Sequence, residues 1–222
     1  VKQWSDGGKL GIEYVVKGLF DGSIKLCIPG KFNVYNSIAA LAVAYLAGVD
    51  MKIVSKELSN VRVLGRVELV HVSDEFSVIV DYAHNEVSTR SVMETLREYK
   101  PNRIICIYGG GGNRARIRRY DMGEVTGEMA DLSILTCDNP RDEEISDINN
   151  DIKVGLAKHN GQYVEIEDRT DAIEYAIRNA VKGDIILLLG KGHEDYQEIK
   201  GVKYHYDERE AIREAAKRVF GN

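Results

Sequence analysis

Uninterrupted apolar runs that alternate with helical stretches constrain the fold of this chain most strongly. Two of them, Ile104–Ile107 and Ile185–Leu189, contain no polar residue, which is typical of strands buried on both faces of a parallel sheet. Strand–helix alternation from residue 68 onward predicts right-handed crossovers and an α/β fold with a doubly wound, mostly parallel sheet. The predicted strands are Phe76–Val80, Arg103–Tyr108, Leu132–Thr136, Tyr163–Ile166 and Asp184–Leu189, and the predicted helices lie near Glu86–Glu98, Met122–Ala130, Ile148–Lys158, Asp171–Val181 and Glu208–Phe220.

The first 64 residues follow a different pattern. Strand-like segments at Leu10–Val16 and Ser23–Cys27 precede an apolar helical stretch from Asn33 to Ala47, and a shorter helix is predicted at Lys52–Leu58. The segment Asn60–Gly65 resembles a linker. Two strands and one good helix make a poor independent core, so we expect this part to pack against another unit.

Composition narrows the functional classes. The net charge is −5 and apolar residues make up 44%, which is ordinary for a soluble globular protein and argues against nucleic-acid binding. No apolar run approaches the roughly 18–20 residues that cross a bilayer, and nothing in the first residues resembles a signal peptide. The initial Val1 suggests a processed chain or a fragment. Cys27, Cys106 and Cys137 form no CxxC pair, so we expect reduced thiols rather than a disulfide or a zinc site.

Unusual polar residues collect directly after four of the predicted strands. These segments are Asp81–His84, Gly109–Arg114, Asp138–Arg141 and Gly190–Asp195. Ligands of an open parallel sheet bind beyond the carboxyl ends of its strands. The coincidence therefore predicts one shared polar crevice.

Each segment alone leaves alternatives open. The four glycines Gly109–Gly112 suit a flexible turn or a backbone site for an anion, and they match neither GxxxxGK[ST] nor GxGxxG. The basic run Arg114–Arg119 is a solvated face or a binding site for carboxylate or phosphate. A loop of glycines and polar residues such as Gly190–Glu194 contributes little to a hydrophobic core, which favours a ligand-binding site there.

Other candidates have both a structural and a functional interpretation. Asp138-Asn139-Pro140 is a turn sequence in its own right, although Arg141 behind it favours recognition of a charged substrate. Asp81 could cap the next helix, and His84 alone is more often structural. Asn36, one turn after a candidate N-cap at Asn33, could direct its amide at a nucleobase edge.

Taken together and in order, six segments resemble the Mur ligase family. They are GKFNVYNSIAA (30–40), GRVELV (65–70), VDYAHN (80–85), YGGGGNRARIRRYDMGE (108–124), TCDNPRDEE (136–144) and GKGHEDYQ (190–197). The resemblance implies a cytoplasmic enzyme of peptidoglycan precursor synthesis with three domains. Residues 1–64 would be the tail of the central ATP-binding domain, and residues 65–222 the Rossmann-like C-terminal domain. The N-terminal domain, the P-loop and the magnesium ligands would lie upstream.

The resemblance also implies a reaction and a set of roles. An ATP- and Mg²⁺-dependent ligase would form an amide bond between a UDP-N-acetylmuramoyl dipeptide and meso-diaminopimelate. The distal centre of that amino acid offers a carboxylate to Arg141 and an ammonium to Glu194, whereas lysine would leave a buried Arg141 without a partner. The implied ATP-binding residues are Asn36, Arg66, Asp81 and His84, and the implied amino-acid pocket consists of Arg114, Asn139, Arg141, Gly190 and Glu194.

Departures from the family pattern keep alternatives open. The chain has Asn85-Glu86 where the family has Thr-Pro, and Asn113 and Ala115 where the family has two aspartates around the arginine. The loop is therefore more positive, and another amino acid could be the substrate of a divergent Mur-type or folylpolyglutamate-synthase-like ligase. A non-catalytic nucleotide- or amino-acid-binding module is a further alternative. The arginines after the glycines disfavour a nicotinamide-dependent dehydrogenase.

Overall fold

A six-stranded sheet forms the centre of the larger part of the protein. The computed structural model describes residues 1–18 and 20–221. The strand order is β4-β5-β9-β6-β7-β8, and every neighbouring pair is parallel except β4 and β5. The predicted doubly wound, mostly parallel sheet is confirmed. The strands are β4 (Glu68–Leu69), β5 (Ser77–Asp81), β6 (Ile104–Tyr108), β7 (Leu132–Leu135), β8 (Tyr163–Glu165) and β9 (Ile185–Leu189).

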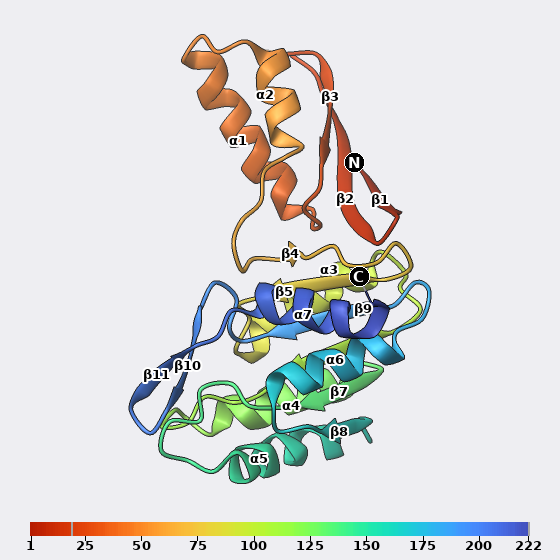
Figure 1. Ribbon diagram of the computed structural model, residues 1–222. Helices are drawn as coiled ribbons and strands as arrows, with labels where there is room; N and C mark the ends of the chain where they lie inside the picture. Colours follow the sequence, from red (N-terminus) through yellow and green to blue (C-terminus); the bar gives the residue numbers. More distant parts are fainter. Residues whose placement is uncertain (19, 222) are drawn as a thin grey trace.

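Helices cover both faces of this sheet (Figure 1). One face packs against α3 (Glu86–Arg97), α4 (Ile117–Met129) and α5 (Ile145–Ala157), and the other against α6 (Arg169–Asn179) and α7 (Glu208–Phe220). The residues of β9 alternate between the two cores: Leu187 belongs to the first, and Ile186 and Leu188 to the second. The apolar run lacks polar residues because both faces are buried.

The first part of the chain forms a smaller unit with its own core. Strands β1 (Lys2–Asp6), β2 (Lys9–Val16) and β3 (Gly22–Leu26) make an antiparallel sheet, and α1 (Phe32–Leu46) and α2 (Met51–Leu58) pack against it. The sequence missed β1, which is polar and largely exposed. Much of α1 is also exposed, including the apolar side chains of Tyr35, Val43 and Leu46.

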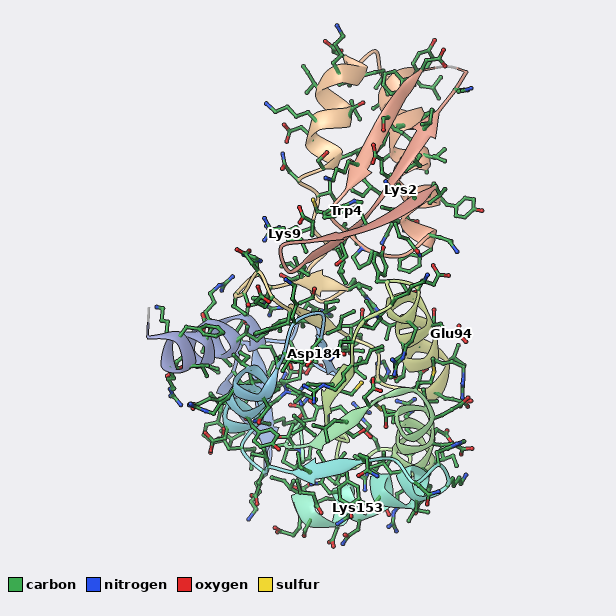
Figure 2. All side chains as sticks on the ribbon, turned by 90° about the vertical axis from the view of Figure 1, so that its right-hand side faces the viewer. Lys2, Trp4, Lys9, Glu94, Lys153 and Asp184 are labelled. Atoms are coloured by element: carbon green, nitrogen blue, oxygen red, sulfur yellow. The ribbon has the colours of Figure 1, made fainter. Side chains whose placement is uncertain are left out.

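The smaller unit contacts the larger one near the amino ends of the strands (Figures 1 and 2). The Ser77 hydroxyl donates to the Gly8 carbonyl over 2.9 Å, and the Tyr99 hydroxyl to the Gly11 carbonyl over 3.0 Å. Asp184, labelled in Figure 2, directly precedes β9 and accepts hydrogen bonds from Asn102 and Arg103. The amino ends of the strands therefore make structural contacts with the smaller unit.

Three differences from the sequence prediction bear on the site. Helix α4 begins at Ile117 rather than at Met122, so the basic run leads into its first turn. A hairpin of β10 (Tyr196–Ile199) and β11 (Val202–His205) follows β9 and was not predicted, nor was the two-residue strand β4.

Within residues 1–18 and 20–221, no helix is long and apolar enough to cross a membrane.

Candidate functional site

A cavity of about 290 Å³ opens at the carboxyl ends of the parallel strands. Loops that follow β5, β6, β7 and β9 all contribute to it, together with the start of α4. The crevice predicted from the four strand ends is therefore present. Its lining residues are Tyr82, His84, Gly109, Gly110, Gly111, Arg114, Ala115, Arg118, Arg119, Met122, Asp138, Asn139, Arg141, Ile152, Gly190 and Glu194.

The glycines after β6 allow two loops to touch. A Cβ atom on Gly109 would lie 2.1 Å from the Thr136 carbonyl oxygen, and one on Gly112 would lie 1.8 Å from that of Pro140. The Gly112 amide also donates to the Asn139 carbonyl over 2.9 Å. The glycines therefore serve first to bring this loop against the loop that carries Asn139 and Arg141.

Two arginines of the basic run are bound to acidic residues. Arg119, with a side chain 3% exposed, contacts Glu143 over 2.8 Å and Asp151 over 3.0 Å, and Arg116 also binds Asp151. The hydrogen bond from Arg116 lowers the pKa of the Asp151 carboxyl, and that from Arg119 lowers the pKa of the Glu143 carboxyl. These arginines fasten α4 to α5 and to the loop after β7.

Arg114 and Arg118 differ from these neighbours. Both line the cavity, and neither side chain makes a hydrogen bond or ion pair within the described part of the chain. One of the two departures around Arg114 has a local explanation. Asn113, at a φ of 54°, donates its side-chain amide to Asp142 over 2.6 Å. An aspartate there would face a second carboxylate.

Asn139 is held in one orientation by its neighbours. Its oxygen accepts from the Lys191 ammonium over 3.2 Å and from the Glu198 amide over 2.9 Å, and its nitrogen donates to Glu194 over 2.9 Å. Lys191 is fully buried and also lies 3.4 Å from Asp138 and 3.6 Å from Glu194. The carboxylate of Glu194 therefore faces the cavity beside a buried cation that the sequence did not single out.

Arg141 lines the cavity with its guanidinium already partly bound. Its Nε donates to the Glu198 carboxylate over 3.0 Å, and its Nη1 to the Gly112 carbonyl over 2.8 Å. The expectation that this arginine lacks a partner when no distal carboxylate is present is therefore wrong. The sequence could not reveal this, because Glu198 belongs to the hairpin that was not predicted.

The four residues implied for ATP do not share this cavity. Only His84 lines it; its Nδ1 donates to the Tyr82 carbonyl over 2.9 Å. Arg66 lies over the Tyr82 ring, 5.2 Å from its centroid, and lines a second cavity of about 330 Å³ together with Lys9, Cys27 and Arg62. Asn36 is exposed on α1 and donates to Asn33 over 3.2 Å.

Asp81 ends β5 as a buried carboxylate. It accepts from the amides of Val67 over 2.8 Å and Ala83 over 2.7 Å. Burial raises the pKa of the Asp81 carboxyl, and these hydrogen bonds and the charge of Arg66 oppose that rise. It does not cap the next helix, because Asn85 does so by accepting from the Ser88 amide. Each Asp81 oxygen keeps a lone pair for a further donor.

Neither the cysteines nor the metal-ligating side chains of the described residues form a second site. Cys106 and Cys137 are buried free thiols, and Cys27 is a half-buried one. Burial raises the pKa of the Cys106 thiol to about 12. Within the residues that the structure describes, no group of three or more His, Cys, Asp or Glu side chains could hold a metal ion.

Comparison with known proteins gives a consistent result. The family described as Mur ligase, glutamate ligase domain, matches residues 65–192. A protein of Caldanaerobacter subterraneus subsp. tengcongensis named UDP-N-acetylmuramoyl-L-alanyl-D-glutamate--2,6-diaminopimelate ligase is 48% identical over 191 residues, which are 86% of this chain and 40% of that protein. A protein of Aquifex aeolicus with the same name is 44% identical over 83% of this chain and 38% of its own length. The chain thus spans about 40% of the length of these curated relatives.

Solved structures agree with these sequence relatives. A structure of a ligase with the same name has a TM-score of 0.75 and 32% identity, and covers 98% of this chain and 44% of its own. A UDP-N-acetylmuramate-alanine ligase of Thermotoga maritima has a TM-score of 0.62 over 99% of this chain and 44% of its own, but only 20% identity, and shares the fold alone.

Proposed function

Since the chain belongs to the Mur ligase family, we propose that it forms the amino-acid-binding end of a UDP-N-acetylmuramoyl-tripeptide synthetase. The whole ligase would add meso-diaminopimelate to UDP-N-acetylmuramoyl-L-alanyl-D-glutamate in the cytoplasm. The observation that carries the proposal is the cavity at the ends of β6, β7 and β9, which combines guanidinium groups with the carboxylate of Glu194. That combination suits a distal centre with one negative and one positive group.

Arg141, Asn139 and Glu194 would bind this distal centre. Guanidinium groups form short charge-assisted hydrogen bonds with carboxylates, and Arg141 has its Nη2 left for one. Glu194 would accept from the distal ammonium, with Asn139 holding the carboxylate in place. A Cβ atom on Gly190 would lie 3.1 Å from the Asp138 carboxylate, so glycine at this position would let the pocket loop pass close to Asp138, and Arg114 would contribute a further positive charge.

Lysine would bind more weakly because it lacks the carboxylate that contacts Arg141, and not because the Arg141 charge would be left unpaired. Arg141 keeps Glu198 and Gly112 as acceptors in either case. The diaminopimelate carboxylate would add a charge-assisted hydrogen bond worth about 1.5–3 kcal/mol. This corresponds to a preference of about 10- to 100-fold.

The nucleotide would bind on the side of Asp81. ATP supplies the phosphoryl group that activates the dipeptide carboxylate, and the amine of the incoming amino acid then displaces phosphate. The carboxylate of Asp81 and the guanidinium of Arg66 would hold the ribose hydroxyls, His84 would lie near the nucleotide, and Asn36 would contact adenine. We place the magnesium ligands in the portion of the longer ligase that this chain does not span.

Two domains are proposed within the chain. Residues 1–64 would be the C-terminal part of the central ATP-binding domain, and residues 65–222 the C-terminal domain. The family match beginning at residue 65 supports the boundary. The exposed apolar side chains of Tyr35, Val43 and Leu46 support a further neighbour for α1, since a helix that is apolar all round is normally buried.

The test uses the intact ligase that contains this chain. Phosphate release with the UDP-linked dipeptide and ATP is measured with meso-diaminopimelate, L-lysine or L-glutamate as acceptor. We expect meso-diaminopimelate to be preferred and Arg141→Ala to lower its kcat/KM by about 10- to 100-fold. Arg213→Ala, an exposed arginine of α7, is the matched control. Equal use of lysine, or a preference for glutamate, would exclude the proposed substrate.

A further inference from the structure

The β10–β11 hairpin is not held by any hydrophobic core. The four residues of β10 are half-buried, the four of β11 are exposed, and none belongs to the three buried clusters. In Figure 1 the hairpin projects beyond the sheet beside the loop region after β7. Isolated two-stranded hairpins are marginally stable in water. The polar contacts between this hairpin and the loop after β7 should therefore stabilise both the hairpin and that loop.

One residue of the hairpin makes most of these contacts. Glu198 donates its amide to the Asn139 side chain over 2.9 Å and accepts from the Arg141 amide with its carbonyl over 3.0 Å. Its carboxylate accepts from Arg141 Nε over 3.0 Å. Glu198 thus uses its amide, carbonyl and side chain on two residues that line the cavity.

The backbone of Arg141 depends on this support. Its φ is +52°, a left-handed conformation that non-glycine residues adopt only where the surroundings enforce it. The amide of Lys200 donates to the Arg141 carbonyl over 2.8 Å, which completes a short bridge between the loop and the hairpin. The hairpin therefore fixes the direction in which the Arg141 side chain leaves the loop.

The carboxylate of Glu198 supports the guanidinium from outside the cavity. Arg141 lines the cavity and Glu198 does not. Glu198 binds Nε and the Gly112 carbonyl binds Nη1, so Nη2 is the guanidinium nitrogen without a partner in the described chain. Both side chains are partly buried, at 18% and 25% exposure, which strengthens the pair relative to a surface ion pair.

We propose that Glu198 is a positioning residue that sets the selectivity of the cavity by holding Arg141 toward the distal carboxylate of the amino acid. The selectivity part rests on the proposed function. A carboxylate that competed with the ligand would need to lie in the cavity, in front of the guanidinium. Glu198 instead occupies the guanidinium edge that faces the hairpin.

Steady-state kinetics of the intact ligase test the selectivity. We expect Glu198→Ala to raise the KM for meso-diaminopimelate about tenfold, with kcat within about twofold. Glu198→Gln keeps an acceptor for Arg141 Nε and should raise KM only about two- to threefold. The preference over L-lysine should fall by the same factors, because lysine offers Arg141 no carboxylate. Glu210→Ala, an exposed glutamate paired with His205 at the end of the same hairpin, is the control and should change neither constant.

An unchanged KM in both Glu198 variants would overturn the proposal, and a lower KM would show that Glu198 competes with the substrate. Crystal structures of the wild-type protein and Glu198→Gln and Glu198→Ala variants test the positioning separately. We expect the Arg141 guanidinium to leave the Gly112 carbonyl in the alanine variant. A guanidinium that does not move would refute the positioning role, whatever the substrate is. A wild-type enzyme that does not prefer meso-diaminopimelate over L-lysine would contradict only the proposed function.

Discussion

The buried ion pair between Arg169 and Glu208 should be the most sensitive structural point beneath the site. Both side chains are fully buried, and Arg169 Nη2 lies 2.6 Å from Glu208 Oε1. The same guanidinium donates to the carbonyls of Cys137 over 3.2 Å and Leu189 over 3.0 Å. These carbonyls immediately precede the loops that carry Asp138 and Gly190. The pair therefore joins α6 and α7 to the ends of β7 and β9.

We expect each single substitution, Arg169→Met or Glu208→Leu, to lower the free energy of unfolding by about 3–5 kcal/mol, because each leaves a buried charge without its counter-ion. For a protein of this size the fall in Tm would be about 6–20 °C. The double variant removes both charges and leaves only the two carbonyls without a donor, at about 1–3 kcal/mol each. Its loss should therefore be smaller than the sum of the single losses.

Urea unfolding followed by circular dichroism measures the three losses in one double-mutant cycle. The expected coupling is about 3 kcal/mol, with the double variant more stable than additivity predicts. Losses that add within about 0.5 kcal/mol would refute the reasoning, because such additivity is typical of independent sites. An exposed pair, Arg218 and Glu214 at 2.6 Å on α7, is the control cycle and should show a much smaller coupling, because solvent screens a surface ion pair.

Three further predictions concern the loops and helices around the site. Gly65→Ala should destabilise the protein more than Gly48→Ala: both glycines have positive φ, but a Cβ on Gly65 would lie 2.1 Å from the His193 amide nitrogen, whereas Gly48 has open space. Comparison of urea midpoints checks this, and equal losses would contradict it. Asn113→Asp should raise the KM for the amino acid, because the new carboxylate would face Asp142; an unchanged KM would show that the loop adapts. The pKa values of Asp151 and Glu143 are lowered in the folded protein, so these carboxylates stabilise it fully only above their unfolded pKa of about 4. Stability should therefore fall as the pH drops below about 4. Asp151→Asn should flatten this dependence, which urea midpoints measured from about pH 2 to 5 would show.

The central sheet could be predicted because its signal is local. Ile185–Leu189 is apolar without interruption since both faces of β9 are buried, and strand–helix alternation then fixes the class of fold. The hairpin gives no such signal, because β10 and β11 are half-buried or exposed and are held by hydrogen bonds to residues far away in the sequence. The start of α4 was misjudged for a similar reason: Arg116 and Arg119 bind acidic side chains near and on α5.

The position of the site could be predicted from the ends of the strands, but its pairing of charges could not. The sequence places Lys191 and Glu194 on one loop, yet only the fold shows that Lys191 is buried beneath Asn139. It also places Arg141 after a turn, where nothing local reveals Glu198. A run of like charges in the sequence therefore does not indicate which charges are available to a ligand.

The pairing of charges decides which arginines are available to a ligand in a chain with a net charge of −5. Arg116 and Arg119 are bound to Asp151 and Glu143, so these two arginines contribute little of their charge to a ligand. Arg114 and Arg118 line the cavity without such partners within residues 1–18 and 20–221. Because low-dielectric walls strengthen the field of charges that line a cleft, these two arginines, with the remaining donor of Arg141, would attract an acceptor amino acid through its carboxylates, while Glu194 would orient its ammonium.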